Sequence, residues 1–512
     1  MKKRVVALML TAGMVFSCLT GCGQEGQQEV SKGTSTSEES SQTSENTQKE
    51  TEKVEEVTTV TWAISGDPQE DDEKVIEEIN KLLRERYNLE LNLLAIPGGE
   101  FNDRMRMMIT GQEDFDLCFT ANWANNFYDN VNQGAFYSLN DLLESEAGAE
   151  LMEVYPEGLY NVATIGGDIY ALPNYQLIYN QGGIFVQKDL ADKYGLKPET
   201  EIQDIVDLEW FMDKIRDNEK DHFVVRHNMS FASSVSRSGI FYDTFGTVAA
   251  VDRADENYQV VNYMKTNYFY EQFKKLNSYY DAGYIRSDVA TVVDDSAEYK
   301  ANKYAMYVNT GKPGGDVDAS NNMGEDYYQF IYGEPTLTPT AGTATMTAIN
   351  VNSKNPEAAL KLYSVMWTDK EIYNMLLFGL EGEHYKKVAD NRVELIADSG
   401  YDRSGLGWML GNQFNAWLLP GQDDTVWEET EAINRSAKQS PLAGFVFDSA
   451  PVESELAQIS SVKTEFQNGY LYAEDYDKWY NDYVTKLDAA GADVVVAELQ
   501  KQIDAWRAAN GK

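Results

Sequence analysis

The chain has 512 residues, and its 83 acidic against 43 basic side chains leave a formal net charge of −40 at neutral pH. Such an acidic surface is repelled by nucleic acid and by anionic lipid headgroups, so we expect neither as a partner. With 43% hydrophobic and 12% aromatic residues, the chain can build a large core and is long enough for two domains.

A basic start and an apolar run at residues 5–16 predict a secretory leader. The run is too short to span a bilayer, which needs about 20 apolar residues. The Leu-Thr-Gly-Cys sequence at 19–22 follows it and resembles the lipobox of bacterial lipoproteins, in which a diacylglycerol is attached to the cysteine. We therefore predict that residues 1–21 are a lipoprotein signal peptide and that Cys22 carries the lipid. The alternative is an ordinary signal peptide with an incidental cysteine.

Residues 22–56 predict a tether, because they consist of Ser, Thr, Gln, Glu, Gly and Lys with almost no apolar side chain. Such a stretch cannot bury enough surface to offset its ordering entropy, and we expect it to be disordered. As a flexible coil its mean reach is about 30 Å.

Cysteine usage excludes an internal disulfide in the rest of the chain. Cys18 leaves with the leader and Cys22 takes the lipid, so only Cys118 remains. It lies in an apolar run, where we expect a buried and unreactive thiol.

Strand and helix patterns alternate at the start of the body. β-branched and aromatic residues predict strands at 57–64, 89–96 and 115–120. Apolar residues spaced for one helix face predict helices that end near 87 and near 110. This order is typical of an α/β fold with a parallel sheet covered by helices.

Polar residues around one tryptophan follow the third of these strands. Ligands of open parallel sheets lie just beyond the carboxyl ends of the strands, which is where this segment falls. Asn122 and Trp123 are therefore the first candidate site residues.

The pattern restarts after residue 183. Strands are predicted at 183–187, 304–308 and 344–351, and helices at 188–194 and 208–216. Asn355 and Pro356 mark a strong helix start. The last helix carries an apolar stripe that ends at Trp506, and no internal repeat is present.

An ordered set of motifs resembles a known family. Besides the lipobox and the tether, it comprises residues 116–126, the Gly-Asp-Ile-Tyr-Ala-Leu-Pro segment at 167–173 and Asn-Ser-Lys-Asn-Pro-Glu-Ala at 352–358. These motifs resemble the extracellular solute-binding lipoproteins of bacterial ABC importers, and most closely the group for oligosaccharides. The carboxyl-terminal part, with Gly-Glu-His-Tyr at 382–385, is similar to a subgroup with a characteristic C-terminal domain. The resemblance covers nearly the whole chain.

The resemblance implies a two-lobed α/β fold with crossover strands, a central cleft and closure by hinge bending. Lobe 1 would hold residues 57–172 and 327–385, and lobe 2 residues 173–326 and 386–512. The protein would be a monomer on the extracellular face of the cell membrane, held by its lipid anchor alone. It would pass an oligosaccharide to ABC permease subunits and need no cofactor and no metal.

The nine tryptophans divide by their neighbours. A sugar presents flat C–H patches and a rim of hydroxyls, so its site needs aromatic faces beside fixed polar groups. The tryptophans in amphipathic or strand patterns are predicted to be core residues: Trp62, Trp210, Trp367, Trp479 and Trp506. Those among Gly, Asn, Gln and Asp are the cleft candidates Trp123, Trp408, Trp417 and, on weaker grounds, Trp427; we predict that Trp123 and at least one of Trp408 and Trp417 lie in the cleft.

Further ligand contacts are predicted around these aromatic residues. Asn412 and Gln413 interleave with the aromatics of 407–417, and Tyr175 follows the crossover proline. Asp67 could accept hydroxyl protons or cap the following helix. Lys312, in a glycine-rich turn, could contact ligand or remain solvated.

Competing functions have less support. A secreted glycosidase or esterase would need paired carboxylates or a nucleophile motif, and no Gly-x-Ser-x-Gly or His-Glu-x-x-His motif is present. The three histidines lack metal-ligand spacing, and residues 316–320 lack the glycine and glutamate of a calcium loop. We therefore expect a binding protein and not an enzyme. A peptide or another small polar solute remains the alternative ligand, and a surface adhesin would show repeats that are absent.

Overall fold

A computed structural model describes residues 57–234, 242–245, 247–292 and 295–511 of the chain. The described residues belong to one compact unit, Glu55–Lys512. The predicted signal peptide, the lipid-bearing Cys22 and the tether lie outside them. None of the described helices is both long enough and apolar enough to cross a lipid bilayer.

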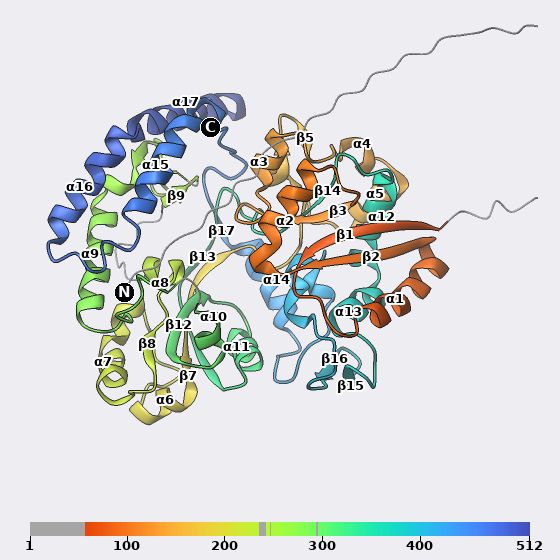
Figure 1. Cartoon of the computed structure of the whole chain (residues 1–512), viewed down its shortest axis with the longest axis horizontal. Coiled ribbons are helices and arrows are strands. Elements are labelled where there is room, and N and C mark those ends of the chain that lie inside the picture. Colours follow the sequence, from red (N-terminus) through yellow and green to blue (C-terminus); the bar gives the residue numbers. More distant parts are fainter. Residues whose placement is uncertain (1–56, 235–241, 246, 293–294, 512) are drawn as a thin grey trace, which may run out of the picture. The chain divides into compact units, whose positions relative to one another are not determined.

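The first sheet has the strand order β2-β1-β3-β14-β6. Strand β1 pairs in parallel with β2 and β3, whereas β14 is antiparallel to β3 and β6 (Figure 1). The strands are β1 (Thr58–Ser65), β2 (Leu89–Ile96), β3 (Leu117–Thr120), β6 (Leu172–Pro173) and β14 (Met346–Ile349). The accompanying helices are α1 (Asp72–Tyr87), α2 (Gly98–Thr110), α3 (Phe127–Asn132), α4 (Asn140–Leu143), α5 (Glu146–Val154), α12 (Pro356–Thr368) and α13 (Lys370–Phe378). The strands and helices predicted for this part are confirmed, with boundaries shifted by a few residues.

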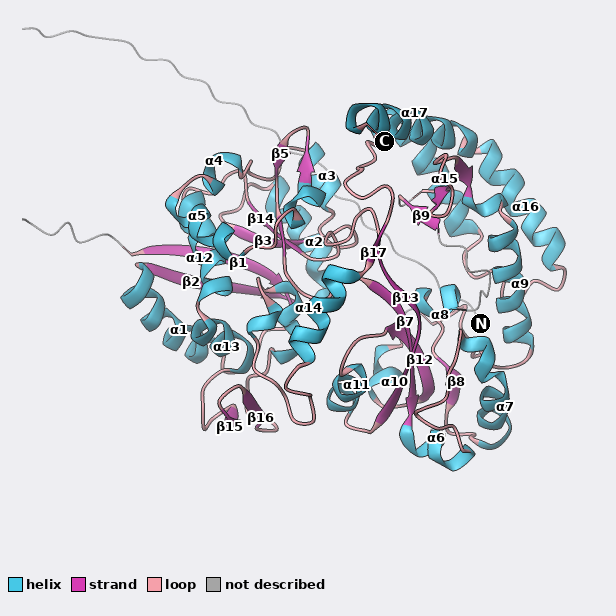
Figure 2. Cartoon of the chain, turned by 180° about the vertical axis from the view of Figure 1, so that it is seen from behind, coloured by secondary structure: helices cyan, strands magenta, loops and turns pink. Residues whose placement is uncertain are grey.

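The second sheet has the order β17-β13-β7-β12-β8 (Figure 2). Strand β7 is antiparallel to both neighbours, β12 and β13. The strands are β7 (Asn180–Gln187), β8 (Phe223–Val225), β12 (Tyr304–Thr310), β13 (Tyr327–Leu337) and β17 (Lys438–Gln439). The helices along this part of the chain are α6 (Lys188–Tyr194), α7 (Glu209–Asn218), α8 (Met229–Ser234), α9 (Asn267–Asp281), α10 (Ser296–Lys300) and α11 (Gly315–Met323).

A small antiparallel sheet and the last helices form a third core. The sheet consists of β9 (Tyr242–Thr244), β10 (Ala249–Asp252) and β11 (Val260–Asn262). The helices are α15 (Glu453–Glu465), α16 (Tyr476–Ala489) and α17 (Ala492–Asn510). Val495, Leu499 and Ile503 of α17 are fully buried here, as their predicted stripe requires.

The remaining elements are short. They are the strands β4 (Thr164–Ile165), β5 (Asp168–Ile169), β15 (Tyr385–Ala389) and β16 (Arg392–Leu395), and the helix α14 (Val426–Ser436). Single 3₁₀ turns lie at Leu159–Ala163, Ile205–Leu208, Tyr263–Lys265, Ser404–Met409, Gln413–Asn415 and Ala450–Val452.

Strand pairing places the division between the two main cores differently from the predicted lobe boundaries. Strand β13, which the prediction put in lobe 1, pairs with β7 along its length and so belongs to the second sheet. Val393, Tyr401 and Met409, which the prediction put in lobe 2, are buried in the first core. The reason is physical: local patterns mark where strands lie, but only hydrogen bonding and packing select the sheet they join.

Three chain segments connect the first sheet with the second. One runs from β6 to β7, one from β13 back to β14, and the third leads through α14 to β17. The first two have one end in each sheet, and the third starts from the first core, where Met409 and Leu410 are buried.

Several side-chain predictions can now be compared with the structure. Trp62 and Trp367 are buried in the first core as predicted, and Cys118 is fully buried as well. The prediction for Trp210 was wrong, since 43% of its surface is exposed. An amphipathic helix pattern predicts a buried stripe, but Trp210 lies beside that stripe on α7.

Two local interpretations also change. Asp67 does not cap the first helix, because the N-cap position of α1 is Asp71. Residues 316–320 lack the glycine and glutamate of a calcium loop; their acidic side chains suit a hydrophilic turn, but the structure places them within helix α11.

Candidate functional site

All four tryptophans predicted for the cleft line one cavity of about 720 Å³. They come from distant parts of the chain: Trp123 follows β3, Trp408 and Trp417 lie in the loops after β16, and Trp427 is on α14. The cavity also exposes amide and hydroxyl side chains: Gln176, Thr310, Asn309, Asn321, Asn322, Ser404, Gln413, Gln422 and Thr430. Aromatic faces and uncharged polar groups therefore surround the same space.

Trp123 is held in place at its edge while its surface remains open. Its Nε1 donates a hydrogen bond to the carbonyl oxygen of Ala344 at 2.9 Å, and its ring lies against the buried Phe119. Even so, 59% of Trp123 is exposed. A large aromatic ring that is anchored and exposed is suited to a binding surface, because its area is available without further ordering.

The other three tryptophans are fixed by neighbouring rings and by a hydrogen bond. Trp408 meets Phe119 edge to face, with ring centroids 5.6 Å apart at 88°. Trp417 stacks on Phe378 at 6.0 Å and 16°. Trp427 donates from Nε1 to the carbonyl oxygen of Ala416 at 2.9 Å.

The charged groups of this cavity form an ion pair. Lys312 is bound to Asp318, and Gln422 Nε2 donates to Asp318 Oδ1 at 2.7 Å. Lys312 therefore lies at the cavity, as one of its two predicted alternatives states, but with its charge neutralised by a carboxylate.

A second cavity of about 860 Å³ adjoins the first. Gln176, Leu177 and Thr310 line both. Two of the segments that connect the sheets form much of its wall, through residues 176–180 and 338–344. Asn122, predicted as a site residue, lines this second cavity.

The second cavity also contains residues that sequence reasoning missed. Tyr242, Phe245 and Phe447 supply aromatic surface, and Arg253 and Lys463 supply charge. Arg253 Nε donates to the buried Asp243 at 2.6 Å. No local pattern distinguishes these residues, because they become neighbours of the crossover segments only in the folded chain.

Three predicted residues lie elsewhere. Tyr175 is 93% buried, stacks on Trp367 at 6.2 Å, and exchanges backbone hydrogen bonds with Gly411 and Gln413. Asn412 accepts a hydrogen bond from the backbone N–H of Phe414. Asp67 is exposed and lines neither cavity. Tyr175 and Asn412 thus shape the loop that carries the cavity residues instead of lining the cavity.

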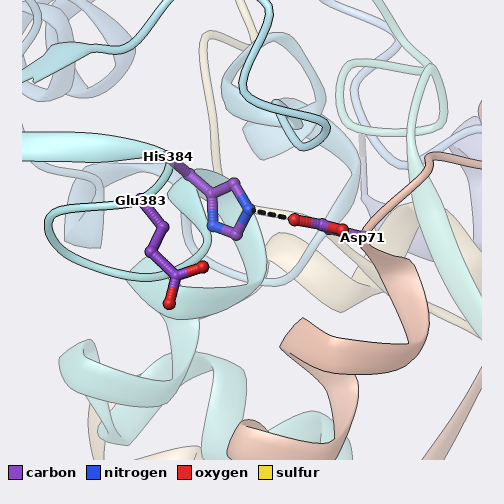
Figure 3. A group of neighbouring side chains, drawn as sticks. All are labelled: Asp71, Glu383 and His384. Carbon is purple, nitrogen blue, oxygen red and sulfur yellow. Dashed lines mark hydrogen bonds and ion pairs between the residues drawn. The ribbon is translucent and has the colours of Figure 1, made fainter.

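A further group of side chains, Asp71, Glu383 and His384, has the composition of a metal site (Figure 3). Its donor atoms are already engaged. His384 Nδ1 accepts the backbone N–H of Leu380 at 2.9 Å, which leaves the ring proton on Nε2, and Nε2 lies 3.0 Å from Asp71 Oδ2. Glu383 is paired with Lys74. This arrangement ties the loop before β15 to the start of α1.

Comparison with known proteins places this geometry in context. Residues 441–508 match the family described as a domain of unknown function, DUF3502. A carbohydrate ABC transporter substrate-binding protein of Streptococcus pneumoniae serotype 4 is 25% identical over 448 residues, which cover 86% of this chain and 89% of that protein.

Solved structures share the whole architecture. The N-glycan transport solute binding protein NgtS of Streptococcus pneumoniae superposes with a TM-score of 0.76 at 22% identity, covering 88% of this chain and 98% of that one. The chain has the fold of a solute-binding protein. The predicted two-lobed α/β fold class and the resemblance to extracellular solute-binding proteins are thereby confirmed.

Two other solved structures superpose on this chain. NgtS in complex with Man1GlcNAc superposes with a TM-score of 0.75 at 23% identity, covering 88% of this chain and 99% of that one. An HMO-binding, ABC-transporter-associated solute-binding protein of Bifidobacterium longum infantis superposes with a TM-score of 0.56 at 15% identity, with the same coverage. In this chain the DUF3502 stretch contains α15 and α16 and supplies Phe447 and Lys463 to the second cavity.

Proposed function

We propose that this protein captures an oligosaccharide in the two adjoining cavities and delivers it to an ABC importer. The observation that carries the proposal is the gathering of Trp123, Trp408, Trp417 and Trp427 around one space bordered by amides. The carbohydrate transporter relative and the sugar complex of NgtS support it.

The chemistry of the first cavity matches that of a sugar. The C–H face of a pyranose packs on an indole, while amide and hydroxyl groups exchange hydrogen bonds with its hydroxyls. We assign ligand contact to Trp123, Trp408, Trp417 and Gln413. Asn122 would contact the part of the ligand in the second cavity.

Tyr175 and Asn412 have a positioning role in this proposal. The backbone of Tyr175 accepts from Gln413 N–H at 2.9 Å and donates to Gly411 at 2.7 Å, which fixes the loop between Trp408 and Trp417. Since a site works best when its contact residues are already ordered, this support lowers the entropy lost on binding.

Closure follows from where the connecting segments lie. Residues 176–180 and 338–344 line the second cavity and also join the two sheets. A ligand that contacts both sides would bind the closed state more tightly and shift the population toward it. No chemical reaction is needed for this.

The anchor is part of the same proposal. A lipid on Cys22 followed by a soft tether would hold the folded unit on the outer face of the membrane as a monomer. Mass spectrometry of the mature amino-terminal peptide checks this, with a diacylglyceryl adduct on Cys22 as the expected result. An unmodified amino terminus produced by cleavage elsewhere would contradict it.

The test of the function compares two ligand libraries on the compact unit 55–512. We expect short oligosaccharides to raise its melting temperature and to bind in calorimetry, and peptides of similar size to do neither. Stabilisation by peptides alone would favour the alternative ligand class. Release of shorter sugars during the incubation would reveal an enzyme instead.

A further inference from the structure

One face of helix α15 lines the second cavity. Leu456, Ile459, Ser460 and Lys463 all border it, and their spacing of three, four and seven residues puts them on one side of the helix. This helix belongs to the DUF3502 stretch. The stretch therefore contributes a wall of the cavity that carries a cation.

Lys463 has no counterion among the residues that the structure describes. Its ammonium makes no ion pair and no hydrogen bond with them, and its side chain is only partly exposed. Burial lowers the pKa of the ammonium, and no neighbouring carboxylate offsets this effect. A cation at a cavity wall without a partner keeps an unused capacity to bind an anion.

The other charged groups at this cavity differ from Lys463. Arg253 is matched by the buried Asp243, which also accepts from the hydroxyl of Ser440. Asp129 lies on the exposed surface of α3. In the first cavity, Lys312 is neutralised by Asp318. Of the three cationic side chains at the two cavities, Arg253 and Lys312 are paired with a carboxylate and Lys463 is not. This contrast is notable because the chain has 83 acidic residues.

Building on the proposed function, we propose that Lys463 forms a subsite for an acidic sugar residue, one that carries a carboxylate or a sulfate group. The neutral part of the same oligosaccharide lies against the tryptophans, since Gln176, Leu177 and Thr310 border both cavities. The acidic group lies against α15. The DUF3502 stretch then acts as the part of the protein that selects for charge.

Energetics favour this assignment. A charge-assisted hydrogen bond is about twice as strong as a neutral one, and a partly buried ammonium gains more from it than one in bulk water. The contact also offsets the cost of keeping the charge away from solvent. With a neutral sugar the same ammonium can donate only to hydroxyl oxygens, which is a weaker contact than one with an anion.

The test compares matched sugars on the unit 55–512. Mannobiose, lactose and diacetylchitobiose are each measured by calorimetry in three forms: neutral, oxidised to a carboxylate at C6 of the non-reducing sugar, and sulfated at that position. We expect at least one acidic form to bind about tenfold more tightly than its neutral parent. Comparing the affinities of the carboxylate and sulfate forms shows which of the two acidic groups the subsite binds.

Variants assign the effect to one side chain. Lys463→Gln should abolish the preference and leave binding of the neutral form within about twofold, whereas Lys463→Arg should retain it. Lys501→Gln is the matched control, because it removes the same charge from the exposed surface of α17 in the same stretch. Because replacing Lys463 breaks no ion pair with a described residue, the melting temperature of Lys463→Gln should not fall.

The outcomes are distinct. If the neutral forms bind with the same affinity as the acidic ones, the acidic subsite is wrong and the proposed function still holds. A preference that survives in Lys463→Gln also overturns it, because another group must then be responsible. If no form of any glycan binds, the proposed function fails and the subsite fails with it.

Discussion

The indole of Trp123 lies beside the indole of Trp408, with ring centroids 6.3 Å apart and ring planes at 34°. One ring follows β3 of the first sheet and the other lies in the 3₁₀ turn Ser404–Met409. Both also contact Phe119, so a single buried ring supports two sides of the first cavity. The two indoles thus form one continuous aromatic surface, which is available to the proposed oligosaccharide.

Removing either ring should weaken oligosaccharide binding strongly. We expect Trp123→Ala or Trp408→Ala to lose about 2 kcal/mol of binding free energy, roughly a 30-fold rise in Kd, because anchor tryptophans dominate such sites. Calorimetry with the best ligand of the library measures the change. Trp210→Ala is the control, since Trp210 is exposed and lines neither cavity. If both cavity variants bound the ligand with unchanged affinity, Trp123 and Trp408 would not be part of the binding site.

Trp62 should matter for stability and not for binding. It is fully buried in the first core and meets Tyr363 edge to face at 6.4 Å. We expect Trp62→Ala to lower the free energy of unfolding by about 3–5 kcal/mol, because it leaves a large cavity. Urea denaturation followed by circular dichroism measures this loss. Trp210→Ala should shift the same value by less than about 0.5 kcal/mol, and equal losses would contradict the assignment of Trp62 to the core.

Asp369 should make the protein sensitive to acid. Burial by itself would raise the pKa of this carboxyl, but the backbone N–H of Ile372 and the guanidinium of Arg86 hold it below its ordinary value. The contribution of ionised Asp369 to the free energy of unfolding is therefore fully present above the pKa of this carboxyl in the unfolded chain, about 4. It is lost as the pH falls through the lower pKa that the carboxyl has in the folded protein.

Replacing this group should reveal its contribution. Asp369→Asn should lower the free energy of unfolding by about 1–2 kcal/mol at neutral pH, since it removes the charge at the N-cap of α13 and the pairing with Arg86. The difference from the unmodified protein should shrink at acid pH, as measured by melting temperature across the pH range. Asp103→Asn serves as control, because Asp103 is 73% exposed. A difference that stayed constant with pH would show that Asp369 does not act through its charge.

Cys118 should be unreactive in the folded protein. It is fully buried, and burial raises the pKa of its thiol to about 12, so almost no thiolate exists at neutral pH. We expect a disulfide reagent to leave the native unit 55–512 unmodified and to label it after unfolding in guanidinium. The absorbance of the thiol that the reagent releases measures the labelling of the native and of the unfolded protein. Rapid labelling of the native protein would mean that the strand β3 opens.

Local sequence determined where many of the strands and helices lie. Runs of β-branched and aromatic residues marked β1, β2 and β3, and the Asn-Pro start marked α12, because these signals depend on local backbone preference. The neighbours of the tryptophans also separated Trp123 and Trp408, which line a cavity, from the buried Trp62 and Trp367. Polar neighbours keep a ring at the surface, and that information is present within a few residues.

Other features depended on the packing of distant segments. The sequence pattern of β13 did not reveal that it pairs with β7, and the helix pattern around Trp210 did not reveal that its ring stays exposed. Asp67 and Tyr175 were plausible contacts from their positions, yet one lies away from both cavities and the other is buried beneath the loop.

Lys463 illustrates the limit most clearly. In sequence nothing distinguishes it from other lysines. Only in the folded chain does it lie in the last turn of α15 and border a cavity beside the crossover segments. Hydrophobic periodicity reports which face of an element is buried, and it carries no information on which other element that face meets. Local sequence therefore set where most strands and helices lie, whereas the meeting of the four tryptophans and Lys463 around adjoining cavities was decided by tertiary packing.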